Sequence, residues 1–143
     1  MNERFTHVDD DGAARMVDVS AKDVTVRTAT ASGRVQVSSD VVAALRDGSA
    51  PKGDVFAVAR IAGIQGAKRT PDLIPLCHPV ALHGVSVDVS VVDDAVEISA
   101  TVRTADRTGI EMEALTAVSA AALTVVDMVN PHARPRQVAP YPE

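Results

Sequence analysis

Three carboxylates stand on one apolar stretch of this 143-residue chain and are the first candidates for chemistry. Glu111 and Glu113 lie near the start of the stretch, and Asp127 lies near its end. Glu113 and Asp127 are 14 residues apart, which on an α-helix puts them on the same side, about 21 Å apart along the axis. One compact pocket in one chain cannot easily hold both groups. A chemistry that used both would combine the start of this helix with the end of a partner subunit's copy.

Each carboxylate also has a structural interpretation. Thr108 and Glu111 form the pattern T-x-x-E, in which Glu111 would cap the helix as the N3 partner of Thr108. Glu113 would be stabilised by the helix dipole in the first turn. Asp127 lies near the C-terminal end, where the dipole disfavours a carboxylate. Because local structure gives Asp127 no reason to be there, it is the better functional candidate.

Lys52 and His78 are the other groups suited to proton transfer. Lys52 precedes Asp54, the predicted N-cap of a helix, so it either binds a phosphate together with the free N–H groups of that helix start or is balanced by Asp54. His78 stands between Cys77 and Pro79, and the proline holds its backbone stiffly. That suits a positioned acid–base group, and it suits a half-buried structural histidine equally. Cys77 is the one cysteine of the chain, so these residues form no metal-binding motif and no metal is expected.

Three further cations stay open between structure and function. Lys68 and Arg69 fit a charge cap at the C-terminal end of a helix. Arg27 lies on a strand rich in Val and Thr and is either a solvated face residue or a phosphate contact.

The elements that must position these groups follow from the spacing of apolar residues. Helices are predicted at residues 41–46, 55–68 and 109–128, and an apolar, proline-stiffened loop at 71–84. Residues 16–37 are predicted to form two strands or one long bent strand, and residues 85–92 and 96–104 an antiparallel hairpin. Helices gathered around an antiparallel sheet give an α+β fold. The best specific prediction is a ferredoxin-like sandwich with the helices on one face.

Composition limits the classes of function. The net charge of −5 argues against a general binder of nucleic acid or anionic membranes. A single cysteine fits a reducing compartment. We expect no apolar run to approach the roughly 20 residues that span a bilayer, and we expect a single-domain, cytoplasmic protein.

Three long segments carry a resemblance to a known family. They are MVDVSAK at 16–22, KGDVFAVARIAGIQGAKRTPDLIPLCHPVAL at 52–82 and TGIEMEALTAVSAAALTVVDM at 108–128. Contiguous and in the family's order, they resemble the cyclic pyranopterin monophosphate synthases, the C protein of molybdenum-cofactor biosynthesis. The resemblance covers most of residues 6–129.

The resemblance implies a phosphorus–oxygen lyase that converts (8S)-3′,8-cyclo-7,8-dihydroguanosine 5′-triphosphate to cyclic pyranopterin monophosphate and releases diphosphate. It implies a ferredoxin-like fold, and a homohexamer of three dimers with active sites at subunit interfaces. No cofactor, nucleic acid or membrane partner is expected. The family's catalytic aspartate falls on Asp127 and its essential lysine on Lys52. Substrate contacts are expected from Leu76, Cys77, His78, Glu111, Met112 and Glu113, with Arg27 and Lys68 as further phosphate contacts.

The chain departs from the family at Asn130, where the family normally has a second catalytic lysine. Residues 130–143 hold four of the eight prolines and no periodicity, so residues 1–129 are predicted to be the domain and 130–143 an atypical, disordered tail. The tail resembles the product of a shifted reading frame. The alternative function is therefore a weakened or inactive family member that serves as a nucleotide-binding or assembly subunit. A third alternative is an interaction module on a ferredoxin-like fold.

Overall fold

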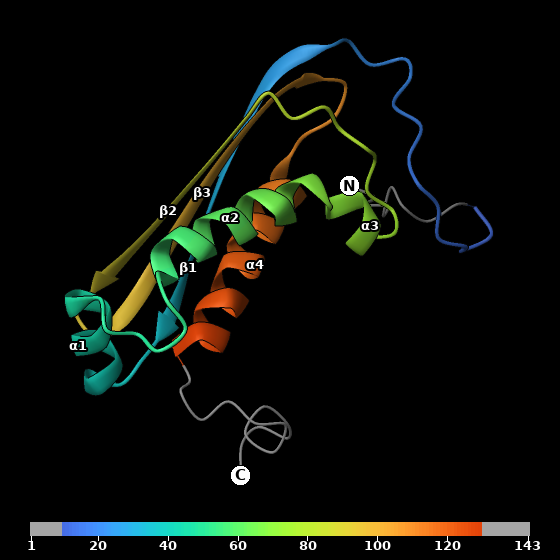
Figure 1. The fold of residues 1–143 in the computed structure, drawn as a ribbon. Helices are drawn as coiled ribbons and strands as arrows, with labels where there is room; N and C mark the ends of the chain where they lie inside the picture. The colour runs from blue at the N-terminus through green and yellow to red at the C-terminus, as the bar shows by residue number, and fades with distance from the viewer. Residues whose placement is uncertain (1–9, 130–143) are drawn as a thin grey trace.

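A three-stranded antiparallel sheet carries the helices of this protein on one face (Figure 1). The computed structural model describes residues 10–129. The strand order is β1-β3-β2, with β1 at Thr25–Gln36, β2 at Gly84–Val92 and β3 at Ala95–Asp106. β2 and β3 form the predicted hairpin, in which Val92 pairs with Ala95 and Asp93 turns the chain at a φ of 55°. The predicted α+β, ferredoxin-like fold with its helices on one face is confirmed.

The described residues form four helices, and three of them follow the predicted pattern closely. The four helices are α1 at Ser39–Asp47, α2 at Val55–Lys68, α3 at Thr70–Leu73 and α4 at Glu111–Val129. The side chain of Ser38 caps α1, and that of Asp54 caps α2 by accepting a hydrogen bond from the backbone N–H of Ala57. The short helix α3 was not predicted, and it forms at the beginning of the proline-rich segment because a proline suits the first turn of a helix.

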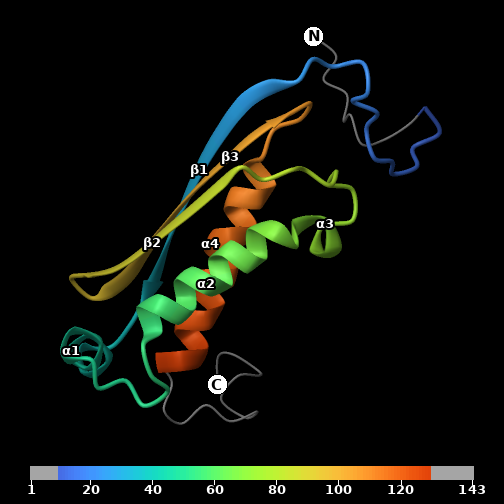
Figure 2. The ribbon, with the colours of Figure 1, turned by 45° about the horizontal axis from the view of Figure 1, so that its top comes forward.

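α2 and α4 cross each other on the same side of the sheet, and α4 lies against β1 and β3 (Figure 2). The small residues of α4 make this close approach possible. A Cβ atom placed on Gly66 of α2 would come within 2.8 Å of the Cβ of Ala120 and 3.1 Å of the backbone oxygen of Thr116. The core between helices and sheet is built from aliphatic residues, the largest of them Val96, Ile98, Val102, Ile110 and Val125.

The strand prediction for residues 16–37 is wrong in its first part. Only Thr25–Gln36 is a strand, while residues 16–24 form an arm that leaves the sheet. The carboxylate of Asp18 accepts a hydrogen bond from the N–H of Ser20 at 2.9 Å, and the N–H of Lys22 donates to the Val19 oxygen at 3.0 Å. These local bonds form a turn that competes with strand pairing.

The predicted capping box at the start of α4 is also wrong. The N–H of Ala114 donates to the carbonyl of Ile110 at 3.1 Å, so Ile110 is the N-cap and Glu111 is the first residue of the helix rather than the third. The carboxylate of Glu111 folds back toward Gly109, where a Cβ atom would stand 2.3 Å from its Oε2. A side chain at position 109 would therefore displace the flexible end of the Glu111 side chain.

The expectation that no apolar run approaches the length of a membrane span is wrong as well. α4 is long and apolar enough to cross a bilayer by length and composition, with a mean hydropathy of 1.6. Its buried side chains, among them Ala117, Ala121 and Val125, pack into the core, and the core helix of a globular domain meets the same two criteria. The predictions for Asn130 and for the tail 130–143 lie outside the described residues.

Candidate functional site

A cavity of about 380 Å³ opens between the proline-rich loop and the start of α4. It brings together two segments of the chain, 74–80 and 108–113, that are distant in the sequence. Six of the predicted site residues line it: Leu76, Cys77, His78, Glu111, Met112 and Glu113. The remaining wall comes from Ile74, Val80, Thr108 and Gly109. The mixture of apolar and polar groups is typical of a small-molecule site.

The loop that carries Leu76, Cys77 and His78 is tied to the end of β3. The hydroxyl of Thr104 donates a hydrogen bond to the Ala81 oxygen, and the N–H of Ala81 donates to Asp106 Oδ2 at 3.3 Å. The N–H of His83 donates to the Arg103 oxygen at 2.9 Å. These bonds hold an apolar loop of irregular structure in place. Sequence reasoning missed Thr104 and Asp106, because nothing in a strand pattern indicates which loop its last residues will bind.

Glu113 is a buried carboxyl group in this cavity, with 3% of its surface exposed. Burial raises its pKa, the nearby charge of Glu111 adds to the rise, and a hydrogen bond from its own backbone N–H opposes it. Burial, followed by the charge of Glu113, also raises the pKa of the Cys77 thiol. The cavity thus favours neutral groups. A protonated Glu113 can donate a hydrogen bond to a ligand, and Cys77 stays a thiol rather than becoming a nucleophilic thiolate.

The backbone at the start of α4 adds hydrogen-bond donors to the cavity. Ile110, which occupies the N-cap, has no polar side chain that could satisfy the first N–H groups of the helix. Glu111, Met112 and Glu113 all line the cavity, so the positive end of the helix dipole lies at its wall. Oxygen atoms of a ligand are favoured here.

His78 links this cavity to the N-terminal arm. Its Nε2 atom is hydrogen-bonded to the carbonyl oxygen of Val17. A second cavity, of about 450 Å³, lies on the arm side of the ring and is lined by arm residues, His78 and the end of β3. Sequence reasoning assigned no role to the arm, although its segment MVDVSAK belongs to the family resemblance.

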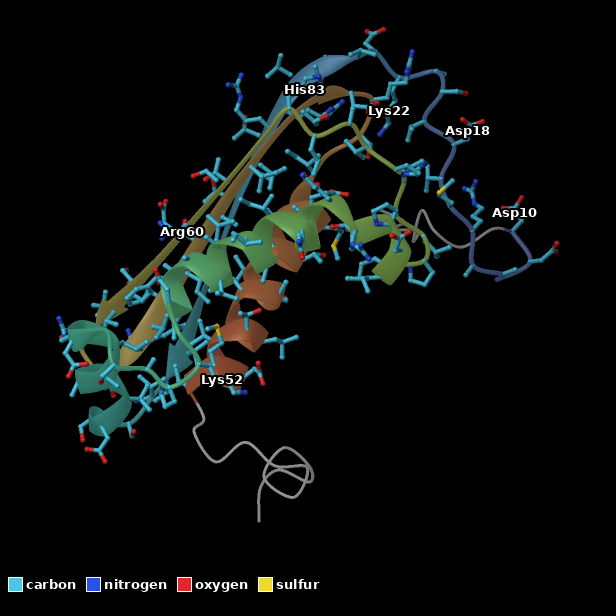
Figure 3. The ribbon with its side chains drawn as sticks, in the orientation of Figure 1. Asp10, Asp18, Lys22, Lys52, Arg60 and His83 are labelled. Carbon is cyan, nitrogen blue, oxygen red and sulfur yellow. The ribbon has the colours of Figure 1, made fainter. Side chains whose placement is uncertain are left out.

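Lys52 and Asp127 form an ion pair at the opposite end of α4. Figure 3 shows Lys52 beside the end of this helix. The Nζ atom of Lys52 lies 3.1 Å from Asp127 Oδ1 and donates to the Asp127 backbone oxygen at 3.0 Å. The exposed fractions of the two side chains are 42% and 68%. Asp54 does not balance Lys52 here, because its carboxylate caps α2. The ion pair explains why a carboxylate is tolerated at the negative end of the helix.

The structure therefore divides the predicted site residues into two groups at the two ends of α4. The cavity residues lie at its start, and Lys52 and Asp127 lie at its end. Arg27 joins neither group: it is half-buried on β1, and its Nε donates to the Asp106 oxygen at 3.3 Å. Lys68 is exposed in the last turn of α2 and does not line the cavity. Within residues 10–129, no three His, Cys, Asp or Glu side chains gather as metal ligands would.

Comparisons with known proteins give one consistent result. A family model described as "MoaC family" matches residues 16–139. The cyclic pyranopterin monophosphate synthase of Streptomyces coelicolor is 73% identical over 128 residues, which are 90% of this chain and 75% of that protein. Cyclic pyranopterin monophosphate synthase 2 of Mycobacterium tuberculosis is 59% identical over 126 residues, 88% of this chain and 75% of that protein. The cyclic pyranopterin monophosphate synthase of a Roseiflexus species is 56% identical over 136 residues, which are 94% of this chain and 86% of that protein.

The match of the family model ends at residue 139. It therefore reaches beyond the domain boundary predicted at residue 129, and that boundary stays a prediction.

Proposed function

Because this chain belongs to the MoaC family, we propose that it is a cyclic pyranopterin monophosphate synthase of molybdenum-cofactor biosynthesis. Its substrate is the cyclised dihydro-GTP, (8S)-3′,8-cyclo-7,8-dihydroguanosine 5′-triphosphate, and its products are cyclic pyranopterin monophosphate and diphosphate. The observation that carries this proposal is the cavity in which Leu76, Cys77 and His78 meet Glu111, Met112 and Glu113.

The cavity suits the base-derived, mostly neutral part of the substrate. Leu76 and Met112 offer apolar contact area, while the buried carboxyl group of Glu113 and the N–H groups at the start of α4 offer polar contacts. The imidazole of His78 has one nitrogen that can accept a proton and one that can donate a proton. Opening and re-closing a purine-derived ring requires such transfers.

Lys52 and Asp127 suit the phosphate part of the reaction. Closing a cyclic phosphate places negative charge on the departing diphosphate, and a positioned ammonium group stabilises that charge. Asp127 holds the Lys52 ammonium at 3.1 Å, so it fixes the position of the cation. Arg27 and Lys68 stay weaker candidates for phosphate contacts, because neither lines the cavity.

The separation of the two groups supports an oligomer with composite active sites. Glu113 and Asp127 lie at opposite ends of α4, about 21 Å apart along its axis, so one copy alone cannot apply both to one substrate. The cavity of one subunit would face the Lys52–Asp127 pair of another. Exposed apolar side chains on the outer surface of α2 and α4, at Val58, Ile61, Leu115, Leu123 and Val126, support an interface there. A homohexamer of three dimers, located in the cytoplasm, is the assembly that we propose.

The test is conversion of the cyclised dihydro-GTP to cyclic pyranopterin monophosphate by the purified 143-residue chain. We expect turnover that Lys52→Ala abolishes. Exposed Lys22, the other lysine of the described N-terminal region, provides the matched control Lys22→Ala. Binding of the substrate without turnover by the wild-type chain would contradict the proposal.

The alternative is a family member disabled at Asn130, which binds the substrate but does not convert it. The amide of asparagine cannot serve as a cationic acid, in contrast to a lysine. Rescue of turnover by Asn130→Lys in an otherwise inactive chain would favour this alternative.

A further inference from the structure

We propose that residues 16–20 of the N-terminal arm border the substrate site at His78, position this side chain and determine which of its ring nitrogens carries the proton. The inference rests on the proposed function for what His78 does, and on geometry alone for its protonation. In this arrangement Nε2 carries the hydrogen and Nδ1 is the nitrogen that exchanges a proton with the substrate.

The contact between His78 and Val17 decides the tautomer. Nε2 of His78 faces the carbonyl oxygen of Val17 at hydrogen-bonding distance. A carbonyl oxygen only accepts hydrogen bonds, so Nε2 must be the donor and must carry a proton. A neutral imidazole has one N–H group. Its lone pair is therefore on Nδ1 whenever the arm is in place.

The arm is built to present this carbonyl group in a defined position. Directly after Val17, Asp18 accepts a hydrogen bond from the N–H of Ser20 at 2.9 Å, and the turn continues through the bond from Lys22 to Val19 at 3.0 Å. Val17 thus leads into a closed turn rather than a free chain end. The charge of Asp18 also acts across to His78: the hydrogen bonds from Ser20 lower the pKa of this carboxyl group most, and His78 lowers it further.

His78 stands between two spaces. On one side lies the substrate cavity that it shares with Glu113. On the other side lies the cavity that it shares with Met16–Ser20 and with residues 106–108, which begin at the last residue of β3. The arm therefore occupies one side of the ring and pairs with Nε2, which leaves Nδ1 for the substrate cavity. Val17 is a positioning residue that acts through His78.

The tautomer is tested by the ¹⁵N chemical shifts of the imidazole nitrogens in histidine-labelled protein. We expect the Nε2–H form for His78, assigned by loss of its signals in His78→Asn. His83 is the internal reference, because its Nδ1 accepts a hydrogen bond from the N–H of Ala105 at 3.2 Å and its proton must also be on Nε2. An Nδ1–H form of His78 would overturn the proposal. This result does not depend on which reaction the protein catalyses.

Two truncations test the role of the arm. Deletion of residues 1–9 keeps Val17, while deletion of residues 1–19 removes it. The arm contributes no residue to the hydrophobic core, so both proteins should melt near the temperature of the full chain. For the longer deletion we expect loss of the Nε2–H preference and a decrease in kcat of about tenfold or more, with a changed pH profile. The shorter deletion should keep both properties.

A longer deletion that retains the tautomer, kcat and pH profile of the full chain would refute the positioning role. If the full chain itself shows no turnover, the proposed function fails, and the ¹⁵N shifts of the two truncations still decide whether the arm sets the tautomer. His78 side-chain variants give an independent comparison. The amide of His78→Asn reaches the place of Nδ1 and that of His78→Gln the place of Nε2, so we expect KM to be closer to the parent value in His78→Asn.

Discussion

Glu113 is held in the fold at a cost that depends on pH. With 3% of its surface exposed, it loses most of its hydration, and its pKa rises above the ordinary value of 4.5. A carboxyl group with a raised pKa contributes stability that is present in full below the unfolded-state pKa and is lost as the pH rises through the folded-state value. Carboxyl groups with a raised pKa cluster at functional sites.

The first prediction follows from this linkage. Glu113→Gln removes the titration and keeps a similar shape, so the variant should gain melting temperature relative to the wild type as the pH rises from about 4 to about 7. Thermal unfolding measured across that range checks the trend. In Glu111→Gln the wild-type dependence should persist in a reduced form, because Glu111 contributes only part of the shift. A constant difference between Glu113→Gln and the wild type at every pH would contradict the raised pKa.

In contrast to Glu113, the ion pair of Lys52 and Asp127 is expected to have little effect on stability. Both side chains are largely exposed, at 42% and 68%, and exposed pairs contribute less than about 1 kcal/mol to stability. Lys52→Ala and Asp127→Asn should therefore change the free energy of unfolding by less than that amount while turnover is lost. Denaturant unfolding and an activity assay on the same samples check this second prediction. A large loss of stability would show that the pair is structural.

At the scale of elements, the approach of α2 to α4 depends on residues without side chains. Gly66 faces Ala120 and the backbone of Thr116, so an added Cβ atom would meet atoms that cannot rotate away. The approach also fixes the position of α4 relative to α2, and hence where both groups of site residues lie. The packing of α2 against α4 therefore determines the geometry of the candidate site.

The third prediction concerns this contact. Gly66→Ala should destabilise the protein by about 1–3 kcal/mol through overpacking, although alanine is the better helix former. Denaturant unfolding monitored by circular dichroism measures the change. Arg60→Ala is the control, because Arg60 is exposed on the same helix (Figure 3). An equally stable or more stable Gly66→Ala protein would mean that the helices can separate without cost.

Most elements could be predicted from the sequence because local signals agreed with the fold. The Asp54 cap and the charged end at Lys68 predicted α2 with its observed bounds, and alternating valines predicted the β2–β3 hairpin. The start of α4 was misplaced because T-x-x-E is a local signal, whereas burial of Ile110 and Ala114 against Val102 places the first turn of the helix. The arm was wrongly predicted to be part of a strand, because its alternation of valines does not show that a turn follows.

The site could be predicted only in part. Resemblance identified the cavity residues, and helix spacing indicated that Glu113 and Asp127 lie far apart. The partner of Lys52, the bonds from Thr104 and Asp106 to the loop, and the contact of Val17 with His78 all join segments distant in sequence. Such contacts leave no periodic signal in a single chain.

At the scale of the whole molecule, the outer side of α4 is unusually apolar. Leu123 is 70% exposed, with Leu115 and Val126 also exposed on the same helix. An apolar stripe of this kind, which also made α4 resemble a membrane-spanning helix, is expected to be covered in an assembly.

The fourth prediction tests whether another subunit covers this apolar stripe. Leu123→Asp should shift the protein to a smaller species in light scattering and reduce turnover, while the helical circular dichroism persists because Leu123 contributes nothing to the core. Ala43→Asp places the same charge on an exposed position of α1 and should leave the assembly intact. If the Leu123→Asp and wild-type proteins have the same mass, the apolar stripe on α4 is not a subunit interface.

The fifth prediction tests composite sites by complementation. Lys52→Ala and Glu113→Ala should each be inactive alone, and co-expression should restore about a quarter of the wild-type activity, since one site in four then receives both intact groups. Co-expressed Lys52→Ala and Asp127→Ala should stay inactive, because these residues come from the same end of the same chain. Activity in that control, or none in the first mixture, would contradict a site shared between copies.

The pairing of β1 with β3 has a consequence for biosynthesis. Thr25 pairs with Asp106 and Gln36 with Ala95, so the first strand of the chain has no partner until the third has been made. At ordinary rates of translation, the 70 residues from Gln36 to Asp106 take about 4 to 14 s to add. During that interval the strand remains unpaired on the nascent chain, while α2 can already form from local contacts. β1 therefore joins the sheet late, and chaperones that protect extended segments are expected to act on the N-terminal third of the protein.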